Sequence, residues 1–278
     1  MLVKTEAIVL HALKYGESKV IADLFTRETG RMSVIVLLGR TQRSRFKKQY
    51  FQPLTLLEVE CDLRPRQQLQ QLRDARQLVP YATIPFSPEK LALALFTAEF
   101  LYHALRSEQR NTPMFDYIRD SVMWLDMAGE GFANFHLTFL MRMSKFLGFF
   151  PNLDEGLSRK DCRGGTVEEG GATVEEGRGT VEEGGRRKEE VGRAFGLMFD
   201  LREGCFTDVV PTHRDFLSPD DARHIQTLMR MDFPTMRLFK LSRHERNRIT
   251  SVLIDYYRLH IPQFPEMKSL SVLQELWG

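Results

Sequence analysis

KYGESKVIADLFTRETGRMSVIVLLGRTQRSRFKK, from Lys14 to Lys48, alternates between turn residues and β-branched runs. Val20–Thr26 and Met32–Leu38 have the composition of strands, and the four residues 27–30 between them end in glycine. A short glycine-bearing connection between two such runs is typical of a β-hairpin. We therefore expect two strands of a small sheet, followed by a loop rich in Lys and Arg.

Three further segments complete a β-rich region in the first eighty residues. Val3–Leu13 is rich in Val, Ile and Leu, and Gln52–Leu63 alternates apolar and acidic residues. The pattern of Gln67–Val79 leaves both a strand and a helix open. Five short strands in this length fit a small closed barrel such as an OB-fold, and an SH3-like barrel would give much the same pattern.

After Pro80 the pattern becomes helical. Start signals, in which a Ser or Thr precedes Pro or stands three residues before Glu, occur at Ser87, Thr112, Ser218 and Ser242. They predict one helix from Ser87 to about Arg106, one from Thr112 through Met127, one that begins at Ser218 and one from Ser242 through Leu259. The spacing of apolar residues predicts two more helices, Phe132–Leu147 and Ser269–Leu276. The fold class is therefore predicted to be α+β, with an OB-fold over residues 1–80 and an all-helical domain over residues 81–278.

One segment of the predicted helical domain has an abnormal composition. Gly164–Arg187 contains three copies of T-V-E-E-G with a period of seven residues. A coiled coil needs two apolar positions in each heptad, and these repeats have one Val and one or two glycines. We interpret residues 156–188 as a disordered acidic insertion without a role, in preference to a decoy that competes with DNA.

Charge and motifs narrow the class of function. The net charge of the chain is +2, but residues 1–80 hold 14 basic and 8 acidic side chains. This imbalance favours a nucleic-acid surface in the first eighty residues. The sequence contains no phosphate loop, metalloprotease motif or nucleophile elbow, so we expect neither an enzyme nor a cofactor. Without a signal peptide or an apolar run long enough for a membrane span, a cytoplasmic protein is expected.

The basic loop is the leading candidate for binding. Its cations are Arg40, Arg43, Arg45, Lys47 and Lys48, and Arg27 and Arg31 flank the preceding hairpin loop. Phe46 and Tyr50 lie among them and are candidates for base stacking, because single-strand binders combine cations with aromatic platforms. Two alternatives stay open: the loop is a solvated surface, and its aromatic residues anchor it in the barrel.

The Phe132–Leu147 helix offers a second candidate surface. Phe139 and Met143 lie on its apolar stripe, with Arg142 and Lys145 off it. If the stripe opens onto a groove, these four residues would suit an acidic, hydrophobic peptide tail. The alternative, which is more common for such a helix, is that the stripe belongs to the core of the bundle.

Several motifs together resemble the RecO family of bacterial recombination mediators. They are K-Y-G-E-S at Lys14–Ser18, L-F-T-x-x-x-G-R at Leu24–Arg31, S-R-F at Ser44–Phe46, Q-P-L at Gln52–Leu54 and F-L-G-F-F-P-N-L at Phe146–Leu153. The terminal Y-Y-R-L-H-I-P and K-S-L-x-V-L segments are similar to the same family. The resemblance covers nearly the whole chain except residues 156–188.

The resemblance implies an OB-fold followed by a helical domain, with no covalent catalysis. It implies binding of single- and double-stranded DNA, annealing of complementary strands, and location at the nucleoid. The implied partners are the acidic C-terminal tail of the single-stranded DNA-binding protein and RecR, with which members help load the RecA recombinase. It maps the DNA contacts to the seven barrel cations named above. Several members hold zinc through four cysteines; here Cys162 lies by the repeats and Cys205 stands alone, so we expect no metal.

Two rival functions are kept beside the mediator. An OB-fold RNA-binding factor would share the cationic barrel but would need no pocket for an acidic tail. A purely structural scaffold would leave the loop solvated and bind nothing.

Overall fold

A computed structural model describes residues 1–38, 46–64, 66–152 and 196–276. The described chain forms two compact units. Unit 1 comprises residues 1–143 and 232–278, and unit 2 comprises residues 144–231. The barrel and most of the helices thus belong to one unit. The T-V-E-E-G repeats, the predicted insertion at 156–188 and Cys162 lie outside the described residues.

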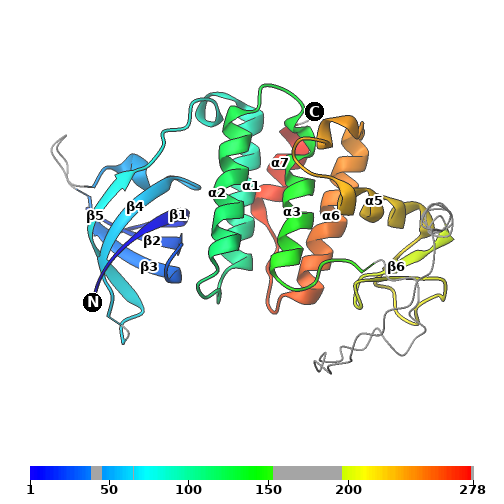
Figure 1. Cartoon of the computed structure of the whole chain (residues 1–278), viewed down its shortest axis with the longest axis horizontal. Coiled ribbons are helices and arrows are strands. Elements are labelled where there is room, and N and C mark those ends of the chain that lie inside the picture. Colours follow the sequence, from blue (N-terminus) through cyan, green and yellow to red (C-terminus); the bar gives the residue numbers. More distant parts are fainter. Residues whose placement is uncertain (39–45, 65, 153–195, 277–278) are drawn as a thin grey trace, which may run out of the picture. The chain divides into compact units, whose positions relative to one another are not determined.

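Five strands of unit 1 close into an OB-like barrel in the order β1-β2-β3-β5-β4 (Figure 1). They are β1 (Leu2–Tyr15), β2 (Lys19–Thr26), β3 (Gly30–Leu37), β4 (Leu56–Asp62) and β5 (Leu69–Gln77). Neighbouring strands are antiparallel, except that β3 and β5 are parallel. The predicted barrel is confirmed, and the segment whose pattern left strand and helix open forms β5.

The alternation of side chains along β4 explains its place in the barrel wall. Leu57, Val59 and Cys61 are at most 1% exposed and join the barrel core. Glu58 and Glu60 lie on the other face and are partly exposed. Because successive strand residues point to opposite faces, this pattern fixes which side of β4 is buried.

The helices of unit 1 begin at the predicted caps, with one difference. α1 (Pro88–Ala104) is capped by Ser87, and α6 (Arg243–His260) has the predicted capping box of Ser242 and Glu245. α2 (Thr112–Met127) is capped by Asn111, whose side chain accepts from Met114 N at 3.1 Å, and not by the predicted Thr112. Both are good caps, and the asparagine stands one residue earlier.

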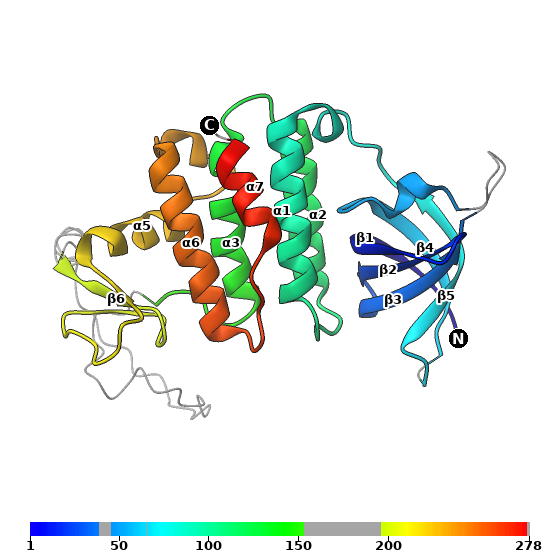
Figure 2. The ribbon, with the colours of Figure 1, turned by 180° about the vertical axis from the view of Figure 1, so that it is seen from behind.

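Two further helical segments complete unit 1. The predicted Phe132–Leu147 helix is a short 3₁₀ turn, η3 (Phe132–Asn134), followed by α3 (Phe135–Phe146). α7 (Lys268–Leu276) lies beside α1 and α6 in both ribbon views (Figures 1 and 2).

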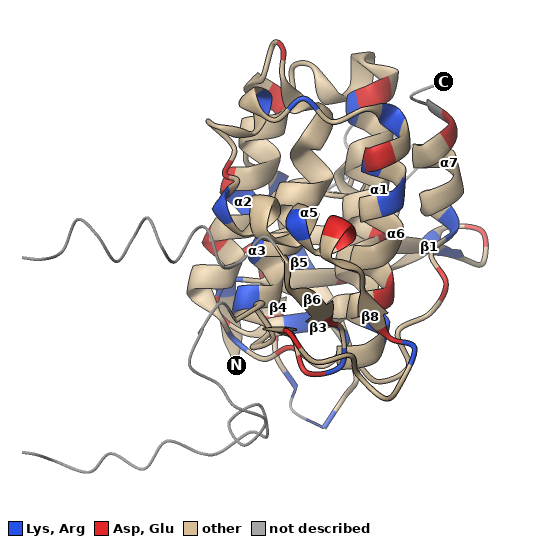
Figure 3. Ribbon diagram, turned by 90° about the vertical axis from the view of Figure 1, so that its right-hand side faces the viewer, with Lys and Arg blue, Asp and Glu red and all other residues tan. Residues whose placement is uncertain are grey.

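Acidic and basic residues are interspersed along the visible helices (Figure 3). No helix in the described ranges is long and apolar enough to cross a membrane.

The link from the barrel to α1 is held by one buried carboxylate. Asp126 is 5% exposed and accepts from the backbone N–H groups of Ala82, Thr83 and Ile84 at 2.8, 2.8 and 2.9 Å. The ammonium of Lys90, also buried, donates to the backbone oxygen of Asp126 at 3.1 Å. The C-terminal end of α2 therefore fixes the path of the chain from the barrel into α1.

Unit 2 departs from the prediction of an all-helical second part. It contains a three-stranded sheet in the order β7-β6-β8, formed by β6 (Met198–Asp200), β7 (Cys205–Thr207) and β8 (Phe216–Leu217). Its helix α5 (Pro219–Arg230) has the predicted Ser218 cap. Strands of two or three residues are too short to give a periodic pattern in the sequence, which is why they were not predicted.

His136 gives unit 1 a specific sensitivity to acid. The imidazole is 2% exposed and its Nε2 lies 3.0 Å from Thr250 Oγ1; burial lowers the pKa of His136 to about 3. Below pH 6.5, His136 is protonated in the unfolded chain but stays neutral in the folded chain. The free energy of unfolding therefore falls as pH decreases towards about 3. We expect a loss of up to about 1.4 kcal/mol per pH unit in this window. Chemical denaturation between pH 6.5 and 4.5 measures it.

The matched variants are His136→Gln and His244→Gln, the second at an exposed histidine of α6. His136→Gln should have a shallower pH dependence than the wild type, whereas His244→Gln should keep the wild-type slope. Equal slopes for the wild type and His136→Gln would show that another group causes the acid sensitivity.

Candidate nucleic-acid interface

The basic loop ends in a short 3₁₀ turn, η1 (Lys48–Phe51), on the barrel. Lys47 and Lys48 are exposed, whereas Arg40, Arg43 and Arg45 lie outside the described residues. Phe51 is 4% exposed and belongs to the barrel core, so it ties the end of the loop to the β scaffold. The two described cations of the loop are therefore held at the surface by a buried neighbour.

The two candidate stacking residues serve mainly as anchors. Phe46 and Tyr50 are half-buried and pack against the barrel core. The ring of Phe46 lies 6.5 Å from that of Phe51, a distance typical of an aromatic pair. Of the two roles weighed for these residues, these contacts favour anchoring of the loop.

The turn between β1 and β2 supplies residues that sequence reasoning missed. Lys14, Tyr15 and Lys19 are exposed there, with 56% of Tyr15 accessible. Lys19 pairs with Leu37 at the end of β3, and Leu38 N donates to Ser18 O at 2.7 Å, so this turn lies where the basic loop leaves the barrel. The signal was present in the K-Y-G-E-S motif, which places a lysine and an aromatic residue at a glycine turn.

Lys14, Lys19, Lys47 and Lys48 differ in their surroundings from the paired cations beside β4 and β5. Within the described ranges these four lysines make no ion pair. On β4 and β5, in contrast, carboxylates neutralise the cations: Arg76 Nε lies 2.7 Å from Glu58 Oε1, which Lys4 also reaches at 3.0 Å. Unpaired lysines lose less on binding a phosphate, because no internal partner has to be released.

Arg31 lies between the barrel and α1. Its side chain is 13% exposed, its guanidinium lies 4.8 Å from the ring centre of Tyr102, and it donates to the backbone oxygen of Tyr102 at 3.3 Å. Asp23 Oδ1 lies 3.4 Å from the same guanidinium. Burial lowers the pKa of Arg31, against the opposing effect of Asp23. This side chain packs the barrel against α1 and is poorly placed for DNA.

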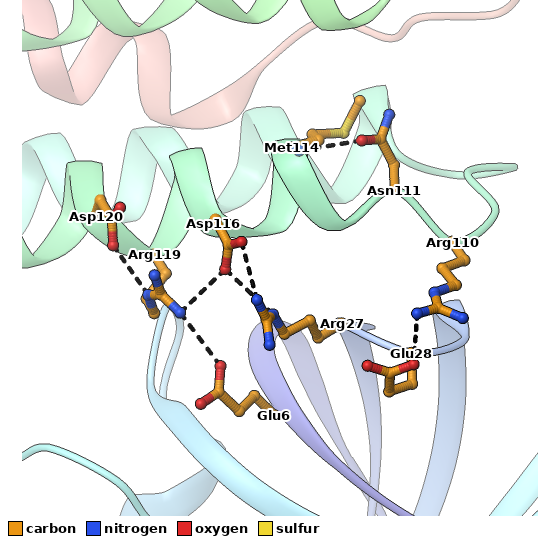
Figure 4. Close-up of polar contacts among 9 residues, drawn as sticks. All are labelled: Glu6, Arg27, Glu28, Arg110, Asn111, Met114, Asp116, Arg119 and Asp120. Carbon is orange, nitrogen blue, oxygen red and sulfur yellow. Dashed lines mark hydrogen bonds and ion pairs between the residues drawn. The ribbon is translucent and has the colours of Figure 1, made fainter.

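Arg27 also points towards the helices (Figure 4). Its Nε and one terminal nitrogen donate to the two carboxylate oxygens of Asp116 on α2 at 3.2 and 3.1 Å. Arg119 connects the same carboxylate to the barrel, at 3.0 Å from Asp116 and 3.4 Å from Glu6. A two-pronged pair of this kind fixes orientation as well as distance, so Arg27 holds the barrel on α2.

The hairpin loop between β2 and β3 makes further contacts with the connection from α1 to α2. Arg110 pairs with Glu28 at 2.8 Å (Figure 4), and Arg31 N donates to Glu108 O at 3.0 Å. Behind these polar contacts, the buried rings of Phe25 and Phe115 lie 6.1 Å apart. The side of the barrel that carries Arg27 and Arg31 is therefore covered by helices.

Gly30 allows this close approach, and its replacement should separate the barrel from the helices. Gly30 has a φ of +75°, and a Cβ at this position would lie 2.4 Å from the carbonyl carbon of Gln109. Gly16 has a similar φ of +69° with nothing within 4 Å of its Cβ position, so it is the matched control. Gly16→Ala should lose about 1–2 kcal/mol of stability from backbone strain alone. Gly30→Ala should lose clearly more in urea unfolding, and equal losses would contradict the contact.

The part of α3 that is predicted to line a tail pocket is largely buried. Phe139 is 1% exposed and Met143 is fully buried, while Arg142 is half-buried and Lys145 exposed. The ring of Phe139 stacks 5.6 Å from that of Tyr117 and 5.9 Å from that of Phe135. The rings and the buried Met143 therefore place the apolar stripe in the core of the bundle, which favours the alternative to a tail pocket.

The described residues do not fit a zinc site. Cys61 and Cys205 are buried, one in the barrel and one in unit 2. Across the described ranges no three side chains of His, Cys, Asp or Glu are grouped in a way that could hold a metal. In unit 2, His213 Nε2 lies 3.2 Å from Asp200 Oδ2, which makes a pair and not a metal-ligand set.

Comparison with known proteins gives matches over nearly the whole chain. Residues 1–81 match the family model described as "Recombination protein O N terminal", and residues 85–270 match "Recombination protein O C terminal". Proteins from Phocaeicola vulgatus and Bacteroides fragilis, each named DNA repair protein RecO, are 42% and 40% identical. A protein of the same name from Porphyromonas gingivalis is 30% identical. Each match covers 100% of both chains.

Proposed function

Because this chain belongs to the RecO family of DNA repair proteins, we propose that it is a recombination mediator that binds single- and double-stranded DNA and anneals complementary strands. It helps load the recombinase onto strands coated by the single-stranded DNA-binding protein, and it acts with RecR. In this proposal it works by binding and not as an enzyme. The rest of the proposal concerns which surface of the molecule holds DNA.

The observation that carries the proposal is a set of four exposed barrel lysines that make no ion pair with any described residue. Lys14 and Lys19 of the β1–β2 turn and Lys47 and Lys48 of the basic loop are exposed. We call these four residues, with Arg40, Arg43 and Arg45, the loop surface. Cations that track a phosphate backbone supply most of the affinity of a protein that binds DNA without sequence preference.

Tyr15 adds a second element to the loop surface. Its exposed ring lies among Lys14 and Lys19, on a turn whose backbone is fixed by strand pairing on both sides. A base stacked on an aromatic side chain contributes about 1–3 kcal/mol in single-strand binders. We therefore assign stacking to Tyr15, whereas Arg27 and Arg31 hold the barrel to the helices.

Annealing follows from this surface without bond chemistry. Two strands that carry like charge repel each other, and cations that neutralise their phosphates lower this repulsion. The protein that coats each strand must also be displaced, and an acidic tail is the element of that protein that a basic surface would attract. Since the stripe of α3 is buried, the tail has to be engaged elsewhere on the chain.

The test uses bare complementary oligonucleotides. The protein should accelerate annealing of two DNA strands, and the rate should fall steeply with salt concentration. RNA strands of the same sequence are the comparison for the RNA-binding alternative. Binding of RNA without acceleration of DNA annealing would favour that alternative, and absence of binding to either would favour the structural scaffold.

A further inference from the structure

A second basic segment lies on the helical part of unit 1. Residues 237–248, RLFKLSRHERNR, hold five Lys or Arg and one carboxylate, Glu245. That carboxylate is engaged by the helix cap, where it accepts from Ser242 N at 2.7 Å. Arg237, Lys240, Arg243, His244 and Arg248 are exposed. The segment therefore presents several cations to solvent while its single acid is held at the start of α6.

Two of its arginines have internal tasks. Arg243 donates to the backbone oxygens of Gln274 and Glu275 at 2.9 and 3.4 Å, which caps the end of α7. Arg246 is half-buried and donates to Leu241 O at 2.6 Å, and burial lowers its pKa. These two side chains help to shape the surface on which Lys240, His244 and Arg248 are exposed.

A pocket opens on this surface between α6 and α7. It has a volume of about 330 Å³ and is lined by His244, Asn247, Arg248, Ser251 and Gln274. All five are polar, and none is a carboxylate. Gln274 Nε2 donates to Ser251 Oγ at 3.3 Å, which leaves the hydroxyl hydrogen of Ser251 to donate to a ligand.

The lining chemistry selects the kind of ligand. An anion is favoured by the guanidinium of Arg248 and by the amide and hydroxyl donors around it. The five lining residues include no aliphatic side chain of the kind that would anchor an acidic, hydrophobic peptide tail. A phosphate group needs only cations and neutral hydrogen-bond donors, and the pocket provides both.

We propose that Lys240, His244 and Arg248, with the donors of the pocket, form a second site for nucleic-acid phosphates, which we call the α6 site. It rests on the proposed function, in which annealing requires two strands to be held at once. Helices α6 and α2 lie on different sides of the helical bundle in both ribbon views (Figures 1 and 2), and α2 is one of the two helices that contact the barrel. The barrel holds one strand at the loop surface, and α6 holds the other.

The experiment measures capture of a second strand. A poly(dT) oligonucleotide is fixed to a surface, the full-length protein is bound to it, and a labelled second poly(dT) is added. Base pairing between the strands is impossible, so retention of the label reports a second site. The test variant is Lys240→Glu with Arg248→Glu; Lys240→Gln with Arg248→Gln serves if the first variant does not fold.

The matched control reverses Arg258 and Lys268, two exposed cations outside the α6 site on α6 and α7, which changes the net charge equally. We expect the test variant to bind the first strand within about twofold of wild type and to retain at least about tenfold less of the second. The control should behave as the wild type in both steps.

Three outcomes separate the claims. Wild-type capture of the second strand by the test variant would overturn the α6 site, because the second strand would then be held elsewhere. An acidic peptide that binds the wild type and not the test variant, while second-strand capture is unchanged in that variant, would also overturn it and assign the surface to a protein tail. Failure of the wild type to bind even the first strand would instead refute the proposed DNA function.

Discussion

Replacing Asp126 with alanine is expected to lower the free energy of unfolding by about 3–5 kcal/mol, the largest loss of stability that we predict for a single substitution in this chain. The carboxylate accepts three backbone N–H groups in the link between barrel and α1. Its removal leaves these donors without partners, in a place where Lys90 is also buried. An unsatisfied buried donor costs more than a hydrogen bond contributes, which is why the expected effect is large.

Asp120 provides the matched control for this prediction. It lies on the same helix but is 68% exposed and pairs with Arg119 at 2.9 Å. Asp120→Ala should cost at most about 1 kcal/mol, as is usual for exposed ion pairs. Urea unfolding of both variants, followed by circular dichroism, measures the difference. Similar losses would mean that the Asp126 network does not hold the link.

The pH dependence of the wild type should carry the same signature. Burial raises the pKa of Asp126, but hydrogen bonds from Ala82, Ile84 and Thr83 outweigh it and hold the pKa below its ordinary value. The stabilisation is therefore present above the ordinary pKa of an aspartate, about 3.9, and is lost as pH falls through the lower folded value. Asp126→Asn should lack this most acidic part of the stability profile.

Reversing charge at Arg43, Arg45, Lys47 and Lys48 together is expected to weaken single-strand binding by at least about a hundredfold at low salt. The slope of log affinity against log salt should fall by about 3, because each phosphate contact on a single strand contributes about 0.7. Fluorescence anisotropy of a labelled oligonucleotide over a range of salt concentrations measures both quantities.

The control for the loop variant reverses four barrel cations that each have a carboxylate partner within the barrel. Lys4, Arg64, Arg73 and Arg76 each lie within 4 Å of Glu58 or Asp62. Their reversal gives the same change in net charge and should reduce the slope much less. Unchanged binding by the loop variant would remove the loop from the DNA surface, whatever the control does.

The order of the elements could be predicted because their signals are local. The Gly30 hairpin, the alternation of Leu57, Val59 and Cys61, and the capping box at Ser242 are each contained in a few residues. The apolar residues of Gln67–Val79 fit the period of a strand and that of a helix equally well, and only pairing with β3 and β4 makes this segment β5. The short strands of unit 2 gave no periodic signal at all.

The roles of the arginines depend on distant residues and could not be predicted. Arg27 meets Asp116, 89 positions away, and Arg31 meets Tyr102, 71 positions away. A basic residue beside a hairpin loop looks the same in sequence whether its partner is a phosphate or a carboxylate. The same limit applied to Phe139 and Met143, since an apolar stripe does not show whether another helix covers it. Lys14 and Tyr15 are visible as part of the K-Y-G-E-S motif, but their exposure and that of Lys19 come from the structure.

The proposed mediator function acts on DNA strands that are coated with another protein. Its most direct test is annealing of complementary strands that are coated with the single-stranded DNA-binding protein, in its intact form or without its acidic C-terminal tail. The mediator function predicts rapid annealing with the intact coating protein and little annealing with the truncated one. Equal annealing in both cases, or none with the intact protein, would contradict it.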